Sequence, residues 1–146
     1  MNGGRIRDFA YLLLRVVTGL LFFQHGGQKL LGWFGGIPPE HGGQPELMSQ
    51  VGIGGLLELV GGLLIMVGLF TRGVAFILSG MMAVTYFQFH QPTAFWPIEN
   101  HGELAVLYCF IFLYMAAQGA GELSLEGLIR GRRGPAGGSR PVRASG

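Results

Sequence analysis

Charged residues are scarce in this chain: 12% of its 146 residues are Asp, Glu, Lys or Arg, against about 25% in an ordinary soluble domain. Hydrophobic residues make up 49%, and the mean hydropathy is +0.44. Cysteine occurs once, as Cys109, which excludes an internal disulfide. These shortages exclude a water-solvated, disulfide-braced domain and favour lipid as the main solvent.

Signatures of resident redox or metal centres are also missing. The four histidines form no H-x-x-x-H pattern, and no C-x-x-C pair occurs. No flavin or iron–sulfur motif is visible, so electrons would have to come from a partner protein or a bound quinone. Neither haem nor a metal ion is expected.

What the chain does have is four long apolar runs. Each is close to the ~20 residues that a helix needs to cross a bilayer. They predict helices at about residues 9–31, 53–70, 74–90 and 103–120. Because no amphipathic helices are present to cover them, the expected fold is an all-α integral membrane four-helix bundle within residues 1–128. The Gly-, Pro- and Arg-rich residues 129–146 are expected to be a disordered tail.

Charge sets the expected orientation, since cytoplasmic segments of membrane proteins are enriched in Lys and Arg. Eight arginines fall on one side if four helices cross: Arg5, Arg7, Arg72, Arg130, Arg132, Arg133, Arg140 and Arg143. The sequence therefore predicts a multi-pass protein with both termini and the tail in the cytoplasm. Its expected partner is the lipid bilayer, nucleic acid is not expected, and self-association is left open.

A polar stripe along the first predicted helix contains Arg15, Thr18, Phe22, His25 and Lys29, spaced 3, 4, 3 and 4 apart. Arg15 is expected to reach toward the inner headgroups, as long cationic side chains do near helix ends. His25 and Lys29 lie near the outer end of the helix.

Glu58 is the most informative single residue of the second run. A carboxylate in hydrocarbon costs ~2.5–3.5 kcal/mol, so it should face the bundle and have a partner. Lys29 or His25 is expected to be that partner, because all three share one depth. Gly54, Gly61 and Gly62 lie on the same face and would let a neighbouring helix approach Glu58 closely. The alternatives are a structural ion pair and a proton-transfer site with Glu58, His25 and Lys29 as catalytic candidates.

The link between the third and fourth runs collects the remaining unusual side chains. Pro92 and Pro97 prevent a continuous helix there. Asn100 is expected to cap the fourth helix, and Trp96 with Glu103 to close a pocket against His25 and Glu58. The ligand-binding candidates are His90, Trp96, Asn100, His101, Glu103, Trp33 and Tyr108. Trp33, Trp96 and Tyr108 are also expected to form an aromatic belt at the outer interface.

The chain resembles the DoxX family of small bacterial membrane proteins. The resemblance is carried by HGGQKLLGWFGG, ELVGGLLIMVGLFTR, YFQFHQPTAFWPIENHGE and LYCFIFLY, which begin at His25, Glu58, Tyr86 and Leu107. It implies a four-helix bundle in the bacterial cytoplasmic membrane and a redox setting, since the related DoxD protein is a subunit of thiosulfate:quinone oxidoreductase.

Two functions follow, and the sequence leaves open whether the protein is an enzyme. The first is a redox-associated subunit linked to quinone or thiol chemistry, with a quinone as cofactor and a redox protein as partner. The alternative is a non-catalytic membrane module that binds a partner protein or a lipophilic ligand. The absence of a redox-centre signature favours the second.

Overall fold

The computed structural model describes residues 3–132, and this part of the chain is helical with no strand. Its four long helices are α1 (Gly3–Leu31), α2 (Gln50–Val67), α3 (Thr71–Thr85) and α5 (Glu103–Gln118). Shorter elements connect or follow them: η1 (Trp33–Gly35), η2 (Pro39–His41), the π-helical turn η3 (Tyr86–His90), α4 (Pro97–Asn100) and α6 (Leu125–Arg132).

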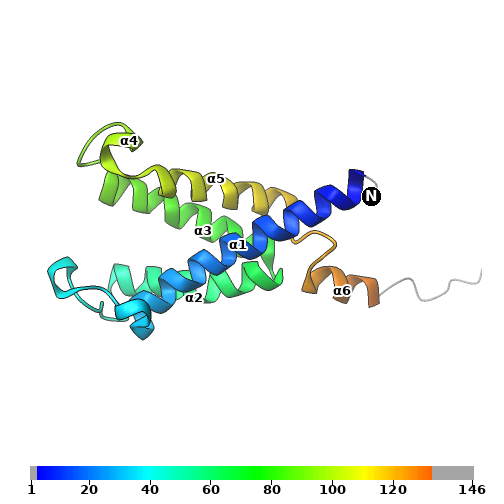
Figure 1. Cartoon of the computed structure of the whole chain (residues 1–146), viewed down its shortest axis with the longest axis horizontal. Coiled ribbons are helices and arrows are strands. Elements are labelled where there is room, and N and C mark those ends of the chain that lie inside the picture. Colours follow the sequence, from blue (N-terminus) through cyan, green and yellow to red (C-terminus); the bar gives the residue numbers. More distant parts are fainter. Residues whose placement is uncertain (1–2, 133–146) are drawn as a thin grey trace, which may run out of the picture.

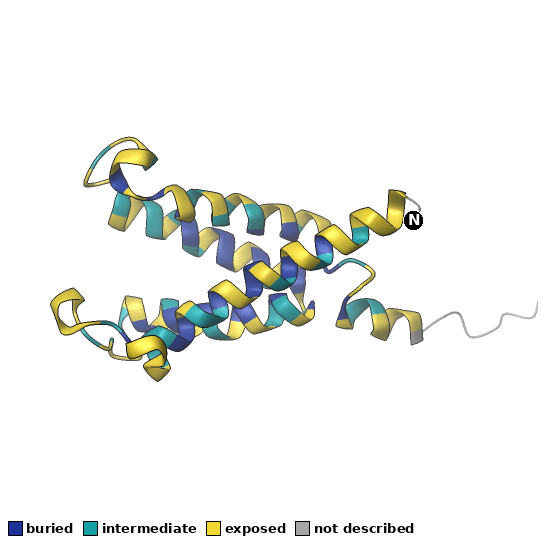
Figure 2. Ribbon diagram, in the orientation of Figure 1, coloured by how far each residue is buried: buried dark blue, intermediate teal, exposed yellow. Residues whose placement is uncertain are grey.

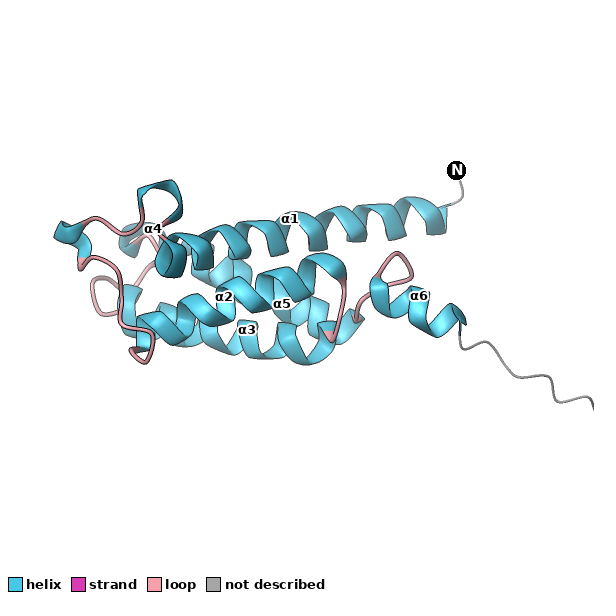
Figure 3. Cartoon of the chain, turned by 90° about the horizontal axis from the view of Figure 1, so that it is seen from below, coloured by secondary structure: helices cyan, strands magenta, loops and turns pink. Residues whose placement is uncertain are grey.

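The long helices form two pairs (Figures 1 and 3). α1 runs along α2, and α3 runs along α5. The pairs are joined by a tight turn in which Gly68 ends α2 with a φ of 71°. The amides of Gly68 and Leu69 donate to the carbonyls of Ile65 and Leu64, a common glycine-dependent helix end. From this turn the two pairs diverge toward the opposite end, which carries residues 32–49 and α4.

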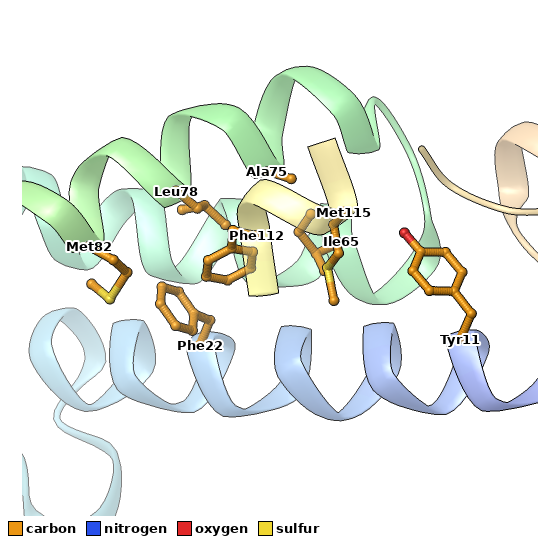
Figure 4. Close-up of a cluster of buried hydrophobic side chains, with 8 residues drawn as sticks. All are labelled: Tyr11, Phe22, Ile65, Ala75, Leu78, Met82, Phe112 and Met115. Atoms are coloured by element: carbon orange, nitrogen blue, oxygen red, sulfur yellow. The ribbon is translucent and has the colours of Figure 1, made fainter. Parts of the chain in front are cut away.

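Aromatic packing holds the two pairs together (Figure 4). Phe22 of α1 meets Phe112 of α5 edge to face, with ring centroids 4.6 Å apart, and lies 4.9 Å from the ring of Tyr108. Such pairs add about 0.5–1.5 kcal/mol to the burial of the rings. The buried cluster is completed by Tyr11, Ile65, Ala75, Leu78, Met82 and Met115.

Glycines set the close approach of α1 to α2. A Cβ added at Gly26 would lie 2.3 Å from the Leu59 amide nitrogen, and one at Gly62 would lie 2.5 Å from that of Phe23. Only residues without a side chain fit at these two positions. The two backbones therefore touch directly, as is common where helices pack within lipid.

The outer faces of all four long helices are exposed (Figure 2) and carry large apolar side chains. Phe9, Val60, Phe76 and Phe110 are between 48% and 68% exposed, each on a different helix. Soluble monomers rarely expose apolar patches larger than a few hundred Å². Two helical segments, Gln50–Val67 and Thr71–His90, are long and apolar enough to span a membrane, and Glu103–Gln118 is a shorter apolar helix.

The helix boundaries differ from those expected. α1 begins at Gly3, and α2 both begins and ends three residues earlier than the apolar pattern indicated. Thr71 starts α3 because its amide is capped by the Glu126 carboxylate, 2.9 Å away. α6 runs to Arg132 and so extends into the stretch expected to be a disordered tail; residues 133–146 lie outside the described part.

Candidate functional site

An ion pair between α1 and α2 is at the centre of the candidate site. Lys29 Nζ donates to Glu58 Oε1 at 2.7 Å. The Glu58 side chain is 8% exposed and that of Lys29 is 26% exposed, so the carboxylate is the buried partner. The structure thus pairs Glu58 with Lys29, as their shared depth predicted. Glu58 Oε2 is also buried and has no hydrogen-bond partner among the described residues.

A cavity of about 460 Å³ opens beside this pair, between α2 and α3. This volume lies within the ~300–1,000 Å³ range of small-molecule sites. Its walls are mostly apolar, and Lys29 and Glu58 supply the charged groups. The other lining residues are Gln50, Val51, Ile53, Gly54, Leu57, Ile77, Met81, Val84, Thr85 and Phe89. An apolar cavity with one polar wall suits a ligand that has a small hydrogen-bonding head.

A polar bridge joins the two helices at the far end of the cavity. Gln50, the first residue of α2, donates from Nε2 to Gln88 Oε1 in the π-helical turn η3. π-helical turns occur frequently at functional sites. Neither glutamine was among the site residues predicted from the sequence. The spacing of Met81, Thr85 and Phe89 does place these three lining residues on one helical face.

His25 is not part of this site. Its side chain is exposed and does not line the cavity. At 100° per residue, His25 lies roughly 80° around the helix from Arg15, at the edge of the predicted stripe. Of the two partners expected for Glu58, Lys29 forms the ion pair, and His25 makes no hydrogen bond or salt bridge to Glu58 within residues 3–132.

The candidate residues between α3 and α5 form a separate structural cluster around Asn100. Its Oδ1 accepts from the Gly102 amide at 2.8 Å, and its Nδ2 donates to the Ala94 carbonyl at 2.9 Å. The Asn100 carbonyl lies 3.0 Å from His90 Nδ1, and the His90 ring stacks on Tyr86. The N-cap of α5 is Gly102, so the expectation that Asn100 caps this helix is wrong.

The other candidates do not reach the cavity. Trp96 is 61% exposed beside Phe95. His101, with a φ of 57°, and Glu103 are both exposed at the start of α5. Neither the Trp96 segment nor His25 closes the Glu58 cavity, so the expected pocket between them is wrong. The physical reason is that the link covers the α3–α5 pair, whereas the cavity opens between α2 and α3.

The two remaining aromatic candidates contact α1, Trp33 at the surface and Tyr108 beside the core. Trp33 folds back onto α1, where a Cβ at Gly27 would lie 1.9 Å from its ring, and its ring contacts Phe23. Tyr108 is half-buried against Phe22 and Phe112. Tyr108 is therefore a core residue, which corrects its place in the expected interfacial belt.

The opposite end of the molecule has a second polar cluster, at the C-terminus of α5. Arg72 donates to the carbonyls of Ala116, Ala117 and Gln118, and Tyr11 donates to that of Gly119. Arg15 is 2% exposed and donates to the carbonyls of Ala120 and Leu123. The expectation that Arg15 reaches the inner headgroups is wrong, because the carbonyls of Ala120 and Leu123, in the link between α5 and α6, lie within its reach.

Within residues 3–132, no group of three or more His, Cys, Asp or Glu side chains could hold a metal ion. The one buried acceptor without a partner at the cavity is Glu58 Oε2, and the adjacent Lys29 ammonium has further N–H groups to donate. Together they offer a donor and an acceptor side by side. This pair fits both redox forms of a quinone head, since a quinone carbonyl accepts hydrogen bonds and a hydroquinone hydroxyl donates them.

Comparison with known proteins places the chain in a family. It is 39% identical over 130 residues to an uncharacterised protein of Haemophilus influenzae, a match covering 86% of this chain and 94% of the relative. It is 32% identical to a Bacillus subtilis protein named "Putative oxidoreductase CatD" (84% and 88% covered). It is 28% identical to the Escherichia coli "Inner membrane protein YqjF" (86% and 95% covered). No solved structure matches at comparable significance. Because the DoxX family model matches residues 10–91, the chain belongs to the DoxX family.

Proposed function

We propose that the protein is a redox-associated subunit of the bacterial cytoplasmic membrane that binds a quinone head beside Lys29 and Glu58. In this proposal α1, α2, α3 and α5 cross the bilayer, and both termini are cytoplasmic. The apolar outer faces of these helices and the inner-membrane relative support the location. The name of the Bacillus relative supports a redox setting.

The observation that carries the proposal is that Glu58, whose buried Oε2 has no hydrogen-bond partner among the described residues, lines a mostly apolar cavity. A buried charged acceptor without a partner is costly, and a hydrogen-bonding ligand would remove that cost. Lys29 would donate to a carbonyl of the head, and Glu58 would accept a hydroxyl proton. A bound quinone supplies two-electron chemistry coupled to two protons. The electrons would pass to or from the redox centre of a partner protein.

The alternative is a non-catalytic module that holds a lipophilic ligand or a partner protein in the membrane. The same cavity supports it, because its apolar walls require only an apolar occupant. A thiol-linked role would depend on a partner's thiols, since the chain's single cysteine, Cys109, lies on α5 and does not line this cavity.

A cavity-filling substitution tests the quinone proposal. Gly54 lines the cavity, and a Cβ added there meets no atom within 4 Å, so Gly54→Phe should fill the cavity without disturbing the backbone. Gly80→Phe is the control, because Gly80 on α3 is equally open but is not among the residues that line the cavity. We expect quinone extracted with the purified protein to fall about tenfold in Gly54→Phe and to stay unchanged in Gly80→Phe.

Glu58→Gln separates the two functions. It keeps the shape of the side chain and removes the proton acceptor, so it should weaken quinone binding and change the pH dependence of that binding. A wild-type protein that carries no quinone, or equal quinone occupancy in the Gly54 and Gly80 variants, would contradict the proposal. A lipid extract containing only phospholipid acyl chains would favour the non-catalytic module.

A further inference from the structure

The rim of the Glu58 cavity faces the surroundings of the bundle as well as the cavity. Five apolar residues line the cavity and are also substantially exposed: Val51 39%, Ile53 46%, Ile77 54%, Val84 48% and Phe89 53%. They come from α2 and from α3 with its continuation η3. The α1–α2 and α3–α5 pairs diverge away from the Gly68 turn (Figure 1). The five rim residues lie along the line where α2 separates from α3 and η3, which we call the seam.

The end of the same seam nearest to the connecting loops is crossed by one hydrogen bond between two exposed polar side chains. The Gln50–Gln88 hydrogen bond joins the first turn of α2 to η3. Glu58 lies eight residues further along α2, which is roughly 12 Å from Gln50. A ligand arriving from outer water would have to break this bridge and then pass about 12 Å of apolar wall. A ligand arriving from the bilayer would meet only the apolar rim.

We infer that the cavity exchanges its ligand with the bilayer through the seam between α2 and α3. The ligand is therefore a lipid-soluble molecule with a small hydrogen-bonding head and a long hydrocarbon chain. The head lies against Lys29 and Glu58, and the chain leaves between Ile53 and Val84 into the surrounding lipid. The Gln50–Gln88 bridge separates the head from outer water. This inference rests on the proposed quinone site. It adds the path by which the ligand enters and leaves, and the long hydrocarbon chain that the ligand carries.

The burial pattern supports this route. Glu58 is 6% exposed, whereas Ile53, five residues before it on α2, is 46% exposed. The charged wall of the cavity at Glu58 is therefore buried, whereas its apolar rim at Ile53 is exposed. Transfer of a hydrocarbon chain from water to an apolar environment is favourable, and more so for each further CH₂ that is buried. A long chain would thus retain its ligand in the bilayer and bring the head to the seam.

The experiment replaces the Gln50–Gln88 hydrogen bond with a reducible covalent cross-link. Gln50→Cys and Gln88→Cys, in a Cys109→Ser background, are joined by a short bifunctional methanethiosulfonate in purified protein reconstituted in lipid vesicles. Exchange of a long-chain isoprenoid quinone and of a tail-less, water-soluble quinone is then measured before and after reduction of the link. Reduction restores the open form of the same molecules, so it serves as an internal control for folding.

We expect the locked protein to exchange the long-chain quinone as fast as the reduced protein does. Ile53→Trp with Val84→Trp should narrow the seam and slow that exchange about tenfold, whereas Val60→Trp, on an exposed part of α2 away from the cavity, should not. The tail-less quinone should bind more weakly than the long-chain one. Arrest of exchange by the lock, unchanged exchange in the seam variant, or equal affinity for both quinones overturns the inference while leaving the site itself intact. Binding of neither quinone overturns the proposed function and this inference with it.

Discussion

Glu58 shows how one buried residue is made compatible with a mostly apolar interior. Its Oε1 has a cationic partner on the neighbouring helix α1, and its Oε2 is buried without a partner among the described residues, beside the cavity that Glu58 helps to line. Removing one member of a buried ion pair usually costs more than the pair contributes, because the other charge is left without compensation. The consequences of substitution should therefore differ between the single and the double variants.

Lys29→Met should destabilise the protein by about 3 kcal/mol, since it leaves the Glu58 carboxylate buried without a partner. Lys29→Met combined with Glu58→Met should recover most of that loss, because the double variant contains no buried charge. Unfolding in mixed micelles with increasing SDS measures both. A double variant as unstable as the single one would show that the charge left on Glu58 is not the cause.

At the residue scale, the sequence was enough to predict some contacts and not others. The pairing of Lys29 with Glu58 could be predicted, because depth in a helix follows directly from residue number. Whether His25 faces the Glu58 cavity depends on a few tens of degrees of rotation around the axis of α1. The spacing of three and four residues does not resolve so small an angle. The role of Asn100 depends on the path of the loop around it, and loop paths are not encoded in a periodic pattern.

At the scale of elements, glycine allows α1 and α2 to pack with their backbones in contact. Gly26 and Gly62 let the two backbones meet, whereas Gly54 on the same helix as Gly62 faces the cavity. The sequence marks all three as small residues on apolar helices. It does not distinguish the glycines that are in contact from the one that faces open space, because this depends on where the neighbouring helix crosses.

Gly26→Ala should destabilise the protein by about 1–3 kcal/mol, since the added methyl group would overlap the Leu59 backbone and force the helices apart. Gly54→Ala is the control, and it should be neutral or stabilise α2 by about 0.5–1 kcal/mol because Ala favours helix formation. Thermal melts in detergent followed by circular dichroism compare the two. Equal losses in both variants would mean that the close approach of α1 to α2 is unimportant.

The link between α5 and α6 is the second element-scale feature, and Arg15→Lys tests how it is held. A lysine head cannot reproduce the planar guanidinium that donates to the Ala120 and Leu123 carbonyls. We expect a loss of about 2 kcal/mol, from a buried carbonyl left without a donor. The measurement is SDS unfolding, with Arg7→Lys as the control because the Arg7 side chain is 79% exposed. Full stability of Arg15→Lys would contradict the capping role.

At the scale of the whole molecule, the apolar runs located the long helices well. Hydropathy reports which segments prefer lipid, so residues 9–31, 53–70, 74–90 and 103–120 all contain most of an observed helix. It does not report which helix packs on which, so neither the two pairs nor the cavity where they diverge could be predicted. α6 was missed because its eight residues are too short and too polar for an apolar pattern.

Reporter fusions after Gly43 and after Gly134 should lie on opposite sides of the membrane. The loop that holds Gly43 is close to the Gln50 end of α2, and the arginine-rich segments gather at the other end. A periplasm-active reporter should be active after Gly43, and a cytoplasm-active reporter after Gly134. Activity of the same reporter at both positions would rule out the proposed topology.

The carbonyls that Arg15 caps have a consequence for biosynthesis. Arg15 and its acceptor Ala120 are 105 residues apart in the chain. When α1 leaves the ribosome, its cation therefore has no native acceptor, and it gains one only after α5 has been translated. The native hydrogen bonds of the first helix are therefore completed only after the last long helix has been made. A polypeptide truncated before Ala120 would lack the acceptors of the buried Arg15 guanidinium.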